Sequence, residues 1–170
     1  MLKPDLPVSE GAVARGINQL STAKQGGILK TIADHNSWRG KANLDGGEWT
    51  TFVDPETSPE FFDHMTDVVK VKFMGESWET GPWVVPNKFP PNTRAERHAH
   101  GADTIYVIMR GSMTFNDGTG WYEPGDVRWV RANHTYGPEE SGPDGCEFIL
   151  VSMGPIDVQW EAGATFQADG

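Results

Sequence analysis

The sequence predicts a single domain with an all-β fold. Of its 170 residues, 20 are glycine and 12 are proline, and this frequency of turn-forming residues disfavours long helices. Short segments of alternating apolar and polar residues lie between turn signals that recur about every 8 to 12 residues. That spacing is typical of β-sandwiches and β-barrels. Seven tryptophans and eight phenylalanines supply large side chains for a core.

The N-terminal part of the chain is expected to pack on this domain. Residues 1 to about 25 are polar and rich in small residues, and Asp45-Gly46-Gly47 resembles a hairpin turn. Ser58, Pro59 and Glu60 are residue types typical of a helix N-terminus, and an approximate helical stripe follows them. The sequence therefore predicts an arm, strands and one short helix in residues 1–68, a barrel in residues 69–160 and a frayed tail in residues 161–170.

From residue 69 onward, the pattern predicts strands throughout. Asn116-Asp117-Gly118 and Glu123-Pro124-Gly125-Asp126 are expected to form turns between two of them. Between residues 127 and 131, the alternation places Val127, Trp129 and Arg131 on one face and Arg128 and Val130 on the other. The expected strands are Val69–Met74, Pro82–Pro86, Thr104–Met109, Gly111–Phe115, Val127–Arg131 and Glu147–Met153.

The charge and the cysteine content limit the function classes. The formal net charge is −10, so the surface repels phosphate groups, which disfavours nucleic acids and anionic membranes as partners. The single cysteine, Cys146, cannot form an intrachain disulfide, and its apolar neighbours predict a core position. The sequence shows neither a signal peptide nor an apolar stretch long enough to span a bilayer. We therefore expect a cytoplasmic protein.

The most informative functional pattern is His98-Ala99-His100. Residues two apart in a strand point to the same face, so both imidazoles can bind one metal ion. Imidazole is a common ligand of zinc, copper, iron and nickel. Glu96 lies on the same face by the same count, which makes it a candidate ligand or general base. The alternative is a pair of surface histidines near a loop.

Two segments that contain this pattern resemble the two signature motifs of the cupin superfamily. In RHAHGADTIYVIMRGSM, His98 and His100 match the H-x-H of the first motif and Gly111 matches its closing glycine. In PGDVRWVRANHTYGP, Pro124-Gly125-Asp126 match the start of the second motif. The resemblance covers about residues 80 to 153. It implies an RmlC-like double-stranded β-helix, the jelly-roll barrel, with metal ligands that face its interior, and it implies a homodimer.

The sequence departs from the cupin pattern at two ligand positions. The motif's glutamate falls on Thr104 and its third histidine on Tyr136. Loss of the glutamate alone would resemble three-histidine cupins such as acetylacetone dioxygenase. His134 precedes Tyr136 by two residues and would face the same way in a strand, so it is the predicted third ligand. A two-histidine site with other donors and a pocket without metal are the alternatives, with His134 then at a turn.

These observations lead to a hypothesis of a small metal-dependent enzyme that acts on an oxygenated small molecule. Iron would indicate a dioxygenase, and zinc, nickel or manganese a lyase or isomerase. Tyr136 is the predicted hydrogen-bond donor or general acid, and Glu96 the predicted base. The predicted substrate contacts are Thr104, Tyr106, Trp129 and Arg131, of which Arg131 would hold a carboxylate. The alternatives are a non-catalytic, metal-free cupin that binds or senses a small ligand, and a metal-free isomerase.

Overall fold

The computed structural model describes residues 43–53, 56, 62–72, 74–75, 80–155 and 157–161, and these residues form an all-β structure. No helix occurs among them. The strands are β1 (Thr50–Val53), β2 (Val69–Val71), β3 (Met74–Gly75), β4 (Trp83–Phe89), β5 (Arg94–Ala95), β6 (His98–Ala99), β7 (Thr104–Thr114), β8 (Trp121–Tyr122), β9 (Val127–Val130), β10 (Glu139–Ser152) and β11 (Gln159–Trp160).

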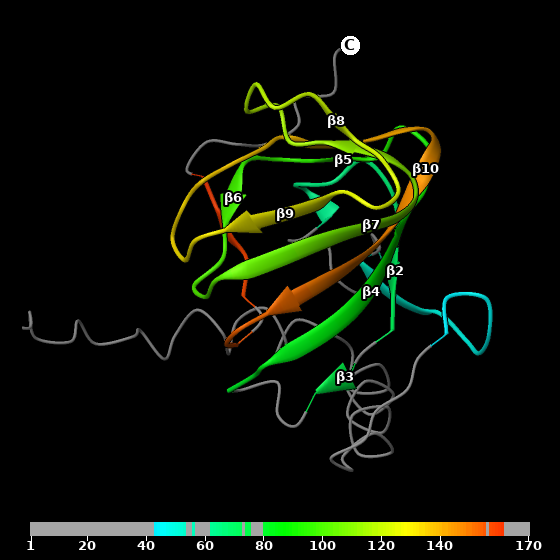
Figure 1. Ribbon diagram of the computed structural model, residues 1–170, viewed down its shortest axis with the longest axis horizontal. Coiled ribbons are helices and arrows are strands. Elements are labelled where there is room, and N and C mark those ends of the chain that lie inside the picture. Colours follow the sequence, from blue (N-terminus) through cyan, green and yellow to red (C-terminus); the bar gives the residue numbers. More distant parts are fainter. Residues whose placement is uncertain are drawn as a thin grey trace, which may run out of the picture.

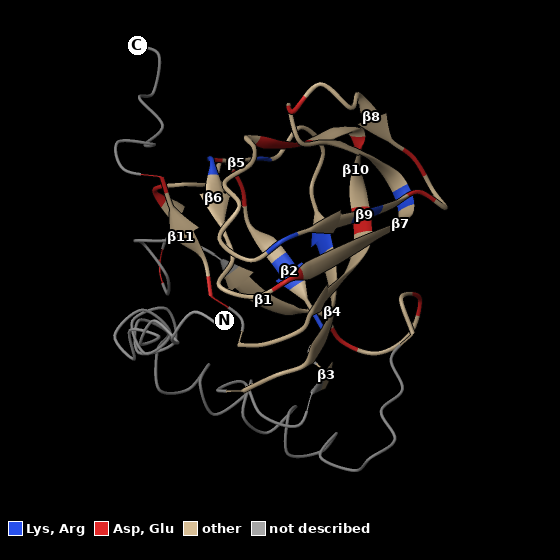
Figure 2. Ribbon diagram, turned by 60° about the vertical axis from the view of Figure 1, so that its left-hand side comes forward, with Lys and Arg blue, Asp and Glu red and all other residues tan. Residues whose placement is uncertain are grey.

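Antiparallel pairing joins most of these strands into one sheet. Its order is β1-β2-β4-β10-β7-β8, with β3 paired to β4, β5 to β10 and β9 to β7. A second sheet pairs β11 with β6. Strands β4, β10, β7 and β9 run side by side, and β5, β6 and β8 lie across the interior from them (Figure 1). Acidic and basic positions are interspersed over the strands and loops (Figure 2).

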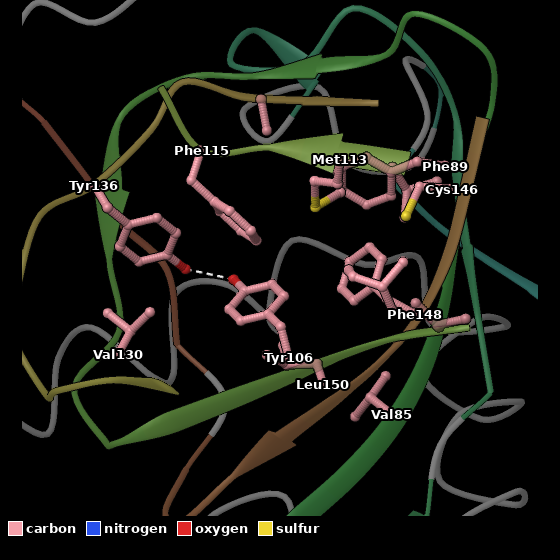
Figure 3. Close-up of a cluster of buried hydrophobic side chains, with 14 of the residues drawn as sticks. Val85, Phe89, Tyr106, Met113, Phe115, Val130, Tyr136, Cys146, Phe148 and Leu150 are labelled. Carbon is pink, nitrogen blue, oxygen red and sulfur yellow. Dashed lines mark hydrogen bonds between the residues drawn. The ribbon is translucent and has the colours of Figure 1, made fainter. Parts of the chain in front are cut away.

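The core lies inside this wrapped sheet because the inward positions of the long strands are apolar. On β7, Tyr106 and Ile108 are buried, whereas Val107 between them is only half-buried. The same alternation on β4 and β10 directs Val85 and Phe148 inward. Aromatic rings then pack against one another across the interior, as in the contacts of Tyr106 with Phe115 and Phe148 (Figure 3). The interior is therefore apolar on most sides.

The paired long strands β7 and β10 contain a bulge at two glycines. The pairing skips from Ser141–Met113 to Cys146–Gly111, and Gly111 and Gly145 have positive φ angles of 67° and 79°. A Cβ atom on Gly111 would lie 2.0 Å from the carbonyl oxygen of Gly145. Residues 104–114 are therefore one strand with a bulge, whereas the sequence predicted two strands separated near residue 110.

Other predictions from the sequence have mixed outcomes. The strands predicted near residues 69, 83, 104, 127 and 147 are confirmed, and β10 begins earlier than expected, at Glu139. The helix predicted after Ser58 falls largely outside the described residues, and its described end is a turn closed by a Met65 N–H to Phe62 carbonyl hydrogen bond. Cys146 is buried, as predicted. The segment expected before the Asp45-Gly46-Gly47 turn also lies outside the described residues. The described part of the chain contains no helix that could span a membrane.

Candidate functional site

A cavity of about 80 Å³ lies in the interior of the barrel. Most of its wall is apolar and comes from β2, β4 and β10, with Val71, Val85 and Leu150 among the lining residues. That volume holds a few water molecules or a small organic molecule. The polar side chains that line it are Asn87, His98, His100, Tyr106 and Glu139. A mostly apolar cavity with a few grouped polar side chains is typical of small-molecule sites.

Backbone carbonyl groups orient the two histidines in this cavity. The Nδ1 atom of His98 is 2.7 Å from the carbonyl oxygen of Glu96, and Nδ1 of His100 bonds the carbonyl oxygen of Asp157. Since a carbonyl oxygen only accepts, each Nδ1 carries the proton and each Nε2 keeps its lone pair. Burial lowers the pKa of both imidazoles from 6.5 to about 4. Both are therefore neutral at neutral pH, with Nε2 able to bind a metal or accept a hydrogen bond.

A buried carboxylate faces these imidazoles. Glu139 Oε1 lies 4.0 Å from His98 Nε2 and accepts a hydrogen bond of 2.8 Å from the Tyr106 hydroxyl. The hydroxyl groups of Tyr106 and Tyr136 point toward one another and are hydrogen-bonded (Figure 3). Burial raises the pKa of the Glu139 carboxyl, an effect that the Tyr106 hydroxyl partly offsets. Burial also raises the pKa of both tyrosines well above 10, so both remain protonated donors.

Comparison with known proteins identifies the fold. No protein-family model matches the sequence, and no curated protein is significantly similar to it. A candidate acetylacetone dioxygenase of Methylibium petroleiphilum aligns with a TM-score of 0.58 and 17% identity, over 76% of this chain and 85% of that chain. An acetylacetone dioxygenase of Acinetobacter johnsonii aligns with a TM-score of 0.57 and 13% identity, over 78% and 85%. The chain has a cupin-like fold. An RmlC-like cupin of Ralstonia eutropha also aligns, with a TM-score of 0.49 and 20% identity over 73% and 71%.

The cupin-like fold brings four of the predicted site residues together. His98 and His100 are adjacent, with ring centroids 5.2 Å apart, and Tyr136 lies 4.8 Å from the His98 ring. Backbone hydrogen bonds in both directions join His98 to Tyr136, so the residue at the motif's third-histidine position lies beside the pair, as the resemblance implied. Tyr106 lines the cavity, whereas Tyr136 lies behind it. Thr104, predicted as a substrate contact, is buried but does not line the cavity, and its hydroxyl has no hydrogen-bond partner among the described residues.

His134 does not join the pair, in contrast to the sequence-based expectation. Its side chain is exposed and lines a separate depression on the surface. The reason is local: residues 131–134 form a turn, closed by a hydrogen bond from His134 N–H to the Arg131 carbonyl, and Asn133 has a φ of 59°. The two-residue period of a strand therefore does not apply to this segment.

Glu96, Trp129 and Arg131 also lie outside the cavity wall. The Glu96 carboxylate is 3.9 Å from Arg94 Nη2, because residue 96 lies between β5 and β6 rather than in a strand with His98. Glu96 contributes to the site through its backbone carbonyl instead. Trp129 and Arg131 point outward, as expected for residues alternating with the buried Arg128 and Val130, and they line the surface depression.

Sequence reasoning missed Glu139. It belongs to the pair Glu139-Glu140, and a pair of glutamates in an acidic chain is typical of a solvated surface. Its position at the start of β10, opposite Ala95 of β5, turns its side chain into the barrel. The only signal in the sequence would have been an alternation of inward-facing and outward-facing residues that extended the last long strand back to residue 139.

The donor chemistry of this site fits a divalent transition metal, although the side chains do not form a complete ligand set. Within the described ranges, no three His, Cys, Asp or Glu side chains are grouped closely enough to hold an ion. His98 and His100 provide two neutral imidazoles, and Glu139 is the nearest carboxylate. Tyr106 holds that carboxylate in the structure. The residues present therefore fit a metal bound by two imidazoles, with Glu139 as the nearest third donor.

Proposed function

We propose that this chain is an enzyme that binds a divalent transition metal through His98 and His100 and acts on a small, mostly apolar molecule with one or two oxygen atoms. The observation behind this proposal is the arrangement of the two imidazoles. Each is fixed by a carbonyl group at Nδ1 and each lines the same cavity. Hydrogen bonds of this kind at the second nitrogen are typical of metal-binding histidines.

The remaining residues of the site would select and orient the substrate. The apolar wall excludes charged molecules and favours an alkyl or aryl body. The protonated Tyr106 hydroxyl lies at the polar end of the cavity, where it can donate its hydrogen bond to a substrate oxygen in place of Glu139. Tyr136 donates to that hydroxyl and so helps to position it. Glu139 can accept a proton from the substrate or complete the ligand set.

A metal ion bound here would supply Lewis acidity, and iron would also supply oxygen chemistry. Two solved structures that align over three quarters of this chain are named as acetylacetone dioxygenases, one of them as a candidate. We therefore propose oxygen-dependent cleavage of a small carbonyl compound as the first reaction to test, followed by lyase and isomerase reactions.

The test is metal stoichiometry in protein purified without a tag and reconstituted separately with iron(II), zinc, nickel and manganese. We expect close to one ion per chain, and loss of it in His98→Ala and His100→Ala. His134→Ala is the matched control and should keep the metal, because that histidine lies outside the cavity. Oxygen consumption by the iron-loaded protein with acetylacetone then tests the reaction. Metal far below one ion per chain, or metal that persists in His98→Ala, would refute the proposal.

A metal-free pocket is the second candidate function, and one observation favours it. Tyr136 occupies the third-histidine position, and Tyr106 and Tyr136 form a hydrogen-bonded chain that ends on Glu139. Such a chain can bind a polar group or exchange protons with a ligand without a metal. The same stoichiometry experiment separates the two candidates, because the metal-free pocket predicts far less than one ion per chain. The metal-free pocket also predicts ligand binding that chelators do not change.

A further inference from the structure

The cavity inside the barrel contains a polar side chain that the proposed function does not use. Asn87 lies within β4 and lines the cavity, and its residue is 7% exposed. Its partners across the sheet are apolar, because the strand register places Val71 of β2 on one side and Phe148 of β10 on the other. Asparagine is disfavoured in strands, and an amide buried among apolar side chains is costly unless it is hydrogen-bonded. A residue that breaks the local pattern in this way indicates a functional position.

The hydrogen bonds of Asn87 leave its side-chain oxygen unpaired. Nδ2 donates to the Val85 carbonyl oxygen at 2.7 Å, which accounts for one N–H of the amide. No residue in the described part of the chain donates to Oδ1. In contrast to the Thr104 hydroxyl, Oδ1 is not fully enclosed by protein atoms, so a molecule in the cavity can reach it. The oxygen is therefore an open acceptor that a hydroxyl group of a ligand can satisfy.

Asn87 is separated from the polar groups that the proposed function uses. Tyr106, Leu150 and Val85 lie opposite one another on β7, β10 and β4, and Asn87 lies two residues further along β4. At about 4.8 Å per strand and about 3.4 Å per residue, the Cα atoms of Tyr106 and Asn87 are about 12 Å apart along the sheet. The cavity wall between them is apolar and includes Val85, Phe148 and Leu150. The cavity therefore has two polar regions with apolar surface between them.

We propose that the substrate carries a hydroxyl group that donates a hydrogen bond to Asn87 Oδ1, remote from the oxygen that faces His98 and His100. The substrate class is then a hydroxy carbonyl compound with a short apolar segment between its two polar groups. Asn87 determines specificity, because an analogue without the hydroxyl leaves the buried oxygen unpaired and binds less tightly. This inference rests on the proposed function for the carbonyl oxygen, whereas the contact with Asn87 itself requires no metal.

Changing the ligand and the protein together tests this contact. The ligands are two pairs of different length, butan-2-one with 4-hydroxybutan-2-one and hexan-2-one with 6-hydroxyhexan-2-one. The proteins are the wild type, Asn87→Val and Asn87→Thr; valine and threonine are similar in shape, but only threonine keeps a hydrogen-bonding group. In at least one pair, the preference for the hydroxy ketone over the ketone should be about five- to tenfold stronger in the wild type than in Asn87→Val. Asn87→Thr should restore part of that preference. An equal preference in the wild type and Asn87→Val, for both pairs, would overturn the proposal.

Titration of both zinc-loaded and chelator-treated protein separates this inference from the proposed function. Zinc should tighten the binding of both members of each pair, and an absence of that effect would contradict the metal-binding proposal alone. The preference that depends on Asn87 should persist in chelator-treated protein. If Asn87→Val fails to fold, the assigned side-chain amide signals of Asn87 in an NMR titration of isotope-labelled wild type decide the question. The hydroxy ketones should shift these signals more than the plain ketones, and equal shifts, or none, would overturn the inference.

Discussion

The hydrogen bond from Tyr106 to Glu139 provides a quantitative test of the site geometry. Both groups are buried, and the hydroxyl is 2.8 Å from Oε1. A buried hydrogen bond contributes about 1 kcal/mol between neutral partners and about 1.5–3 kcal/mol when one partner is charged. Because burial leaves little screening by solvent, we expect the coupling to lie near the upper end of the charged range when Glu139 is ionised. The coupling should therefore grow as the Glu139 carboxyl ionises.

A double-mutant cycle measures this coupling. The four proteins are the wild type, Tyr106→Phe, Glu139→Leu and the double variant, and leucine is close to glutamate in volume. Urea denaturation of chelator-treated protein at pH 5.5 and at pH 8 gives the free energy of unfolding of each. The bond between Tyr106 and Tyr136 is lost in both proteins that carry Tyr106→Phe, so it cancels in the cycle. A coupling below about 0.5 kcal/mol at both pH values, or one that falls as the pH rises, would refute the geometry.

Three further predictions concern stability and reactivity. The folded-state pKa of His98 and of His100 is about 4, below the ordinary value of 6.5, so each imidazole should lower the free energy of unfolding by about 3 kcal/mol as the pH falls from 6.5 to 4. Replacing both histidines with glutamine should flatten this loss in chelator-treated protein. An unchanged pH profile of stability would contradict the prediction. Glu139 acts in the opposite direction, because its raised pKa makes stability fall as the pH rises. Gly111→Ala should lower the free energy of unfolding, measured in urea, by about 2–5 kcal/mol, because residue 111 has a positive φ and the new Cβ would lie 2.0 Å from the Gly145 carbonyl oxygen. Gly118→Ala is the control for the positive φ alone, because no atom lies within 4 Å of its new Cβ. Cys146, with burial raising its pKa to about 12, should react with a thiol reagent only as the protein unfolds, and rapid reaction under native conditions would place it at the surface.

The comparison of residues shows where sequence reasoning works. His98 lies in β6 and His100 directly follows it, and the two line one cavity as the motif predicted for its histidines, while Gly111 lies at the bulge in β7. His134 and Glu96 were placed with the same two-residue rule, but both lie where the chain leaves the strand. The rule fails there because a single turn residue changes which way the following side chains point. The expected homodimer and cytoplasmic location rest on resemblance and composition, and they stay predictions.

The sequence by itself determined the strand pattern, the fold and the pair of imidazoles. Strand periodicity and turn residues are local properties, so they can be read from neighbouring positions along the chain. The tertiary structure decided which side chains complete the site. Glu139 reaches His98 only because β10 pairs with both β5 and β7, and Arg128 is buried only because β9 packs its inner face on Phe115. Contacts between residues far apart in sequence depend on strand register, and no local pattern encodes that register completely.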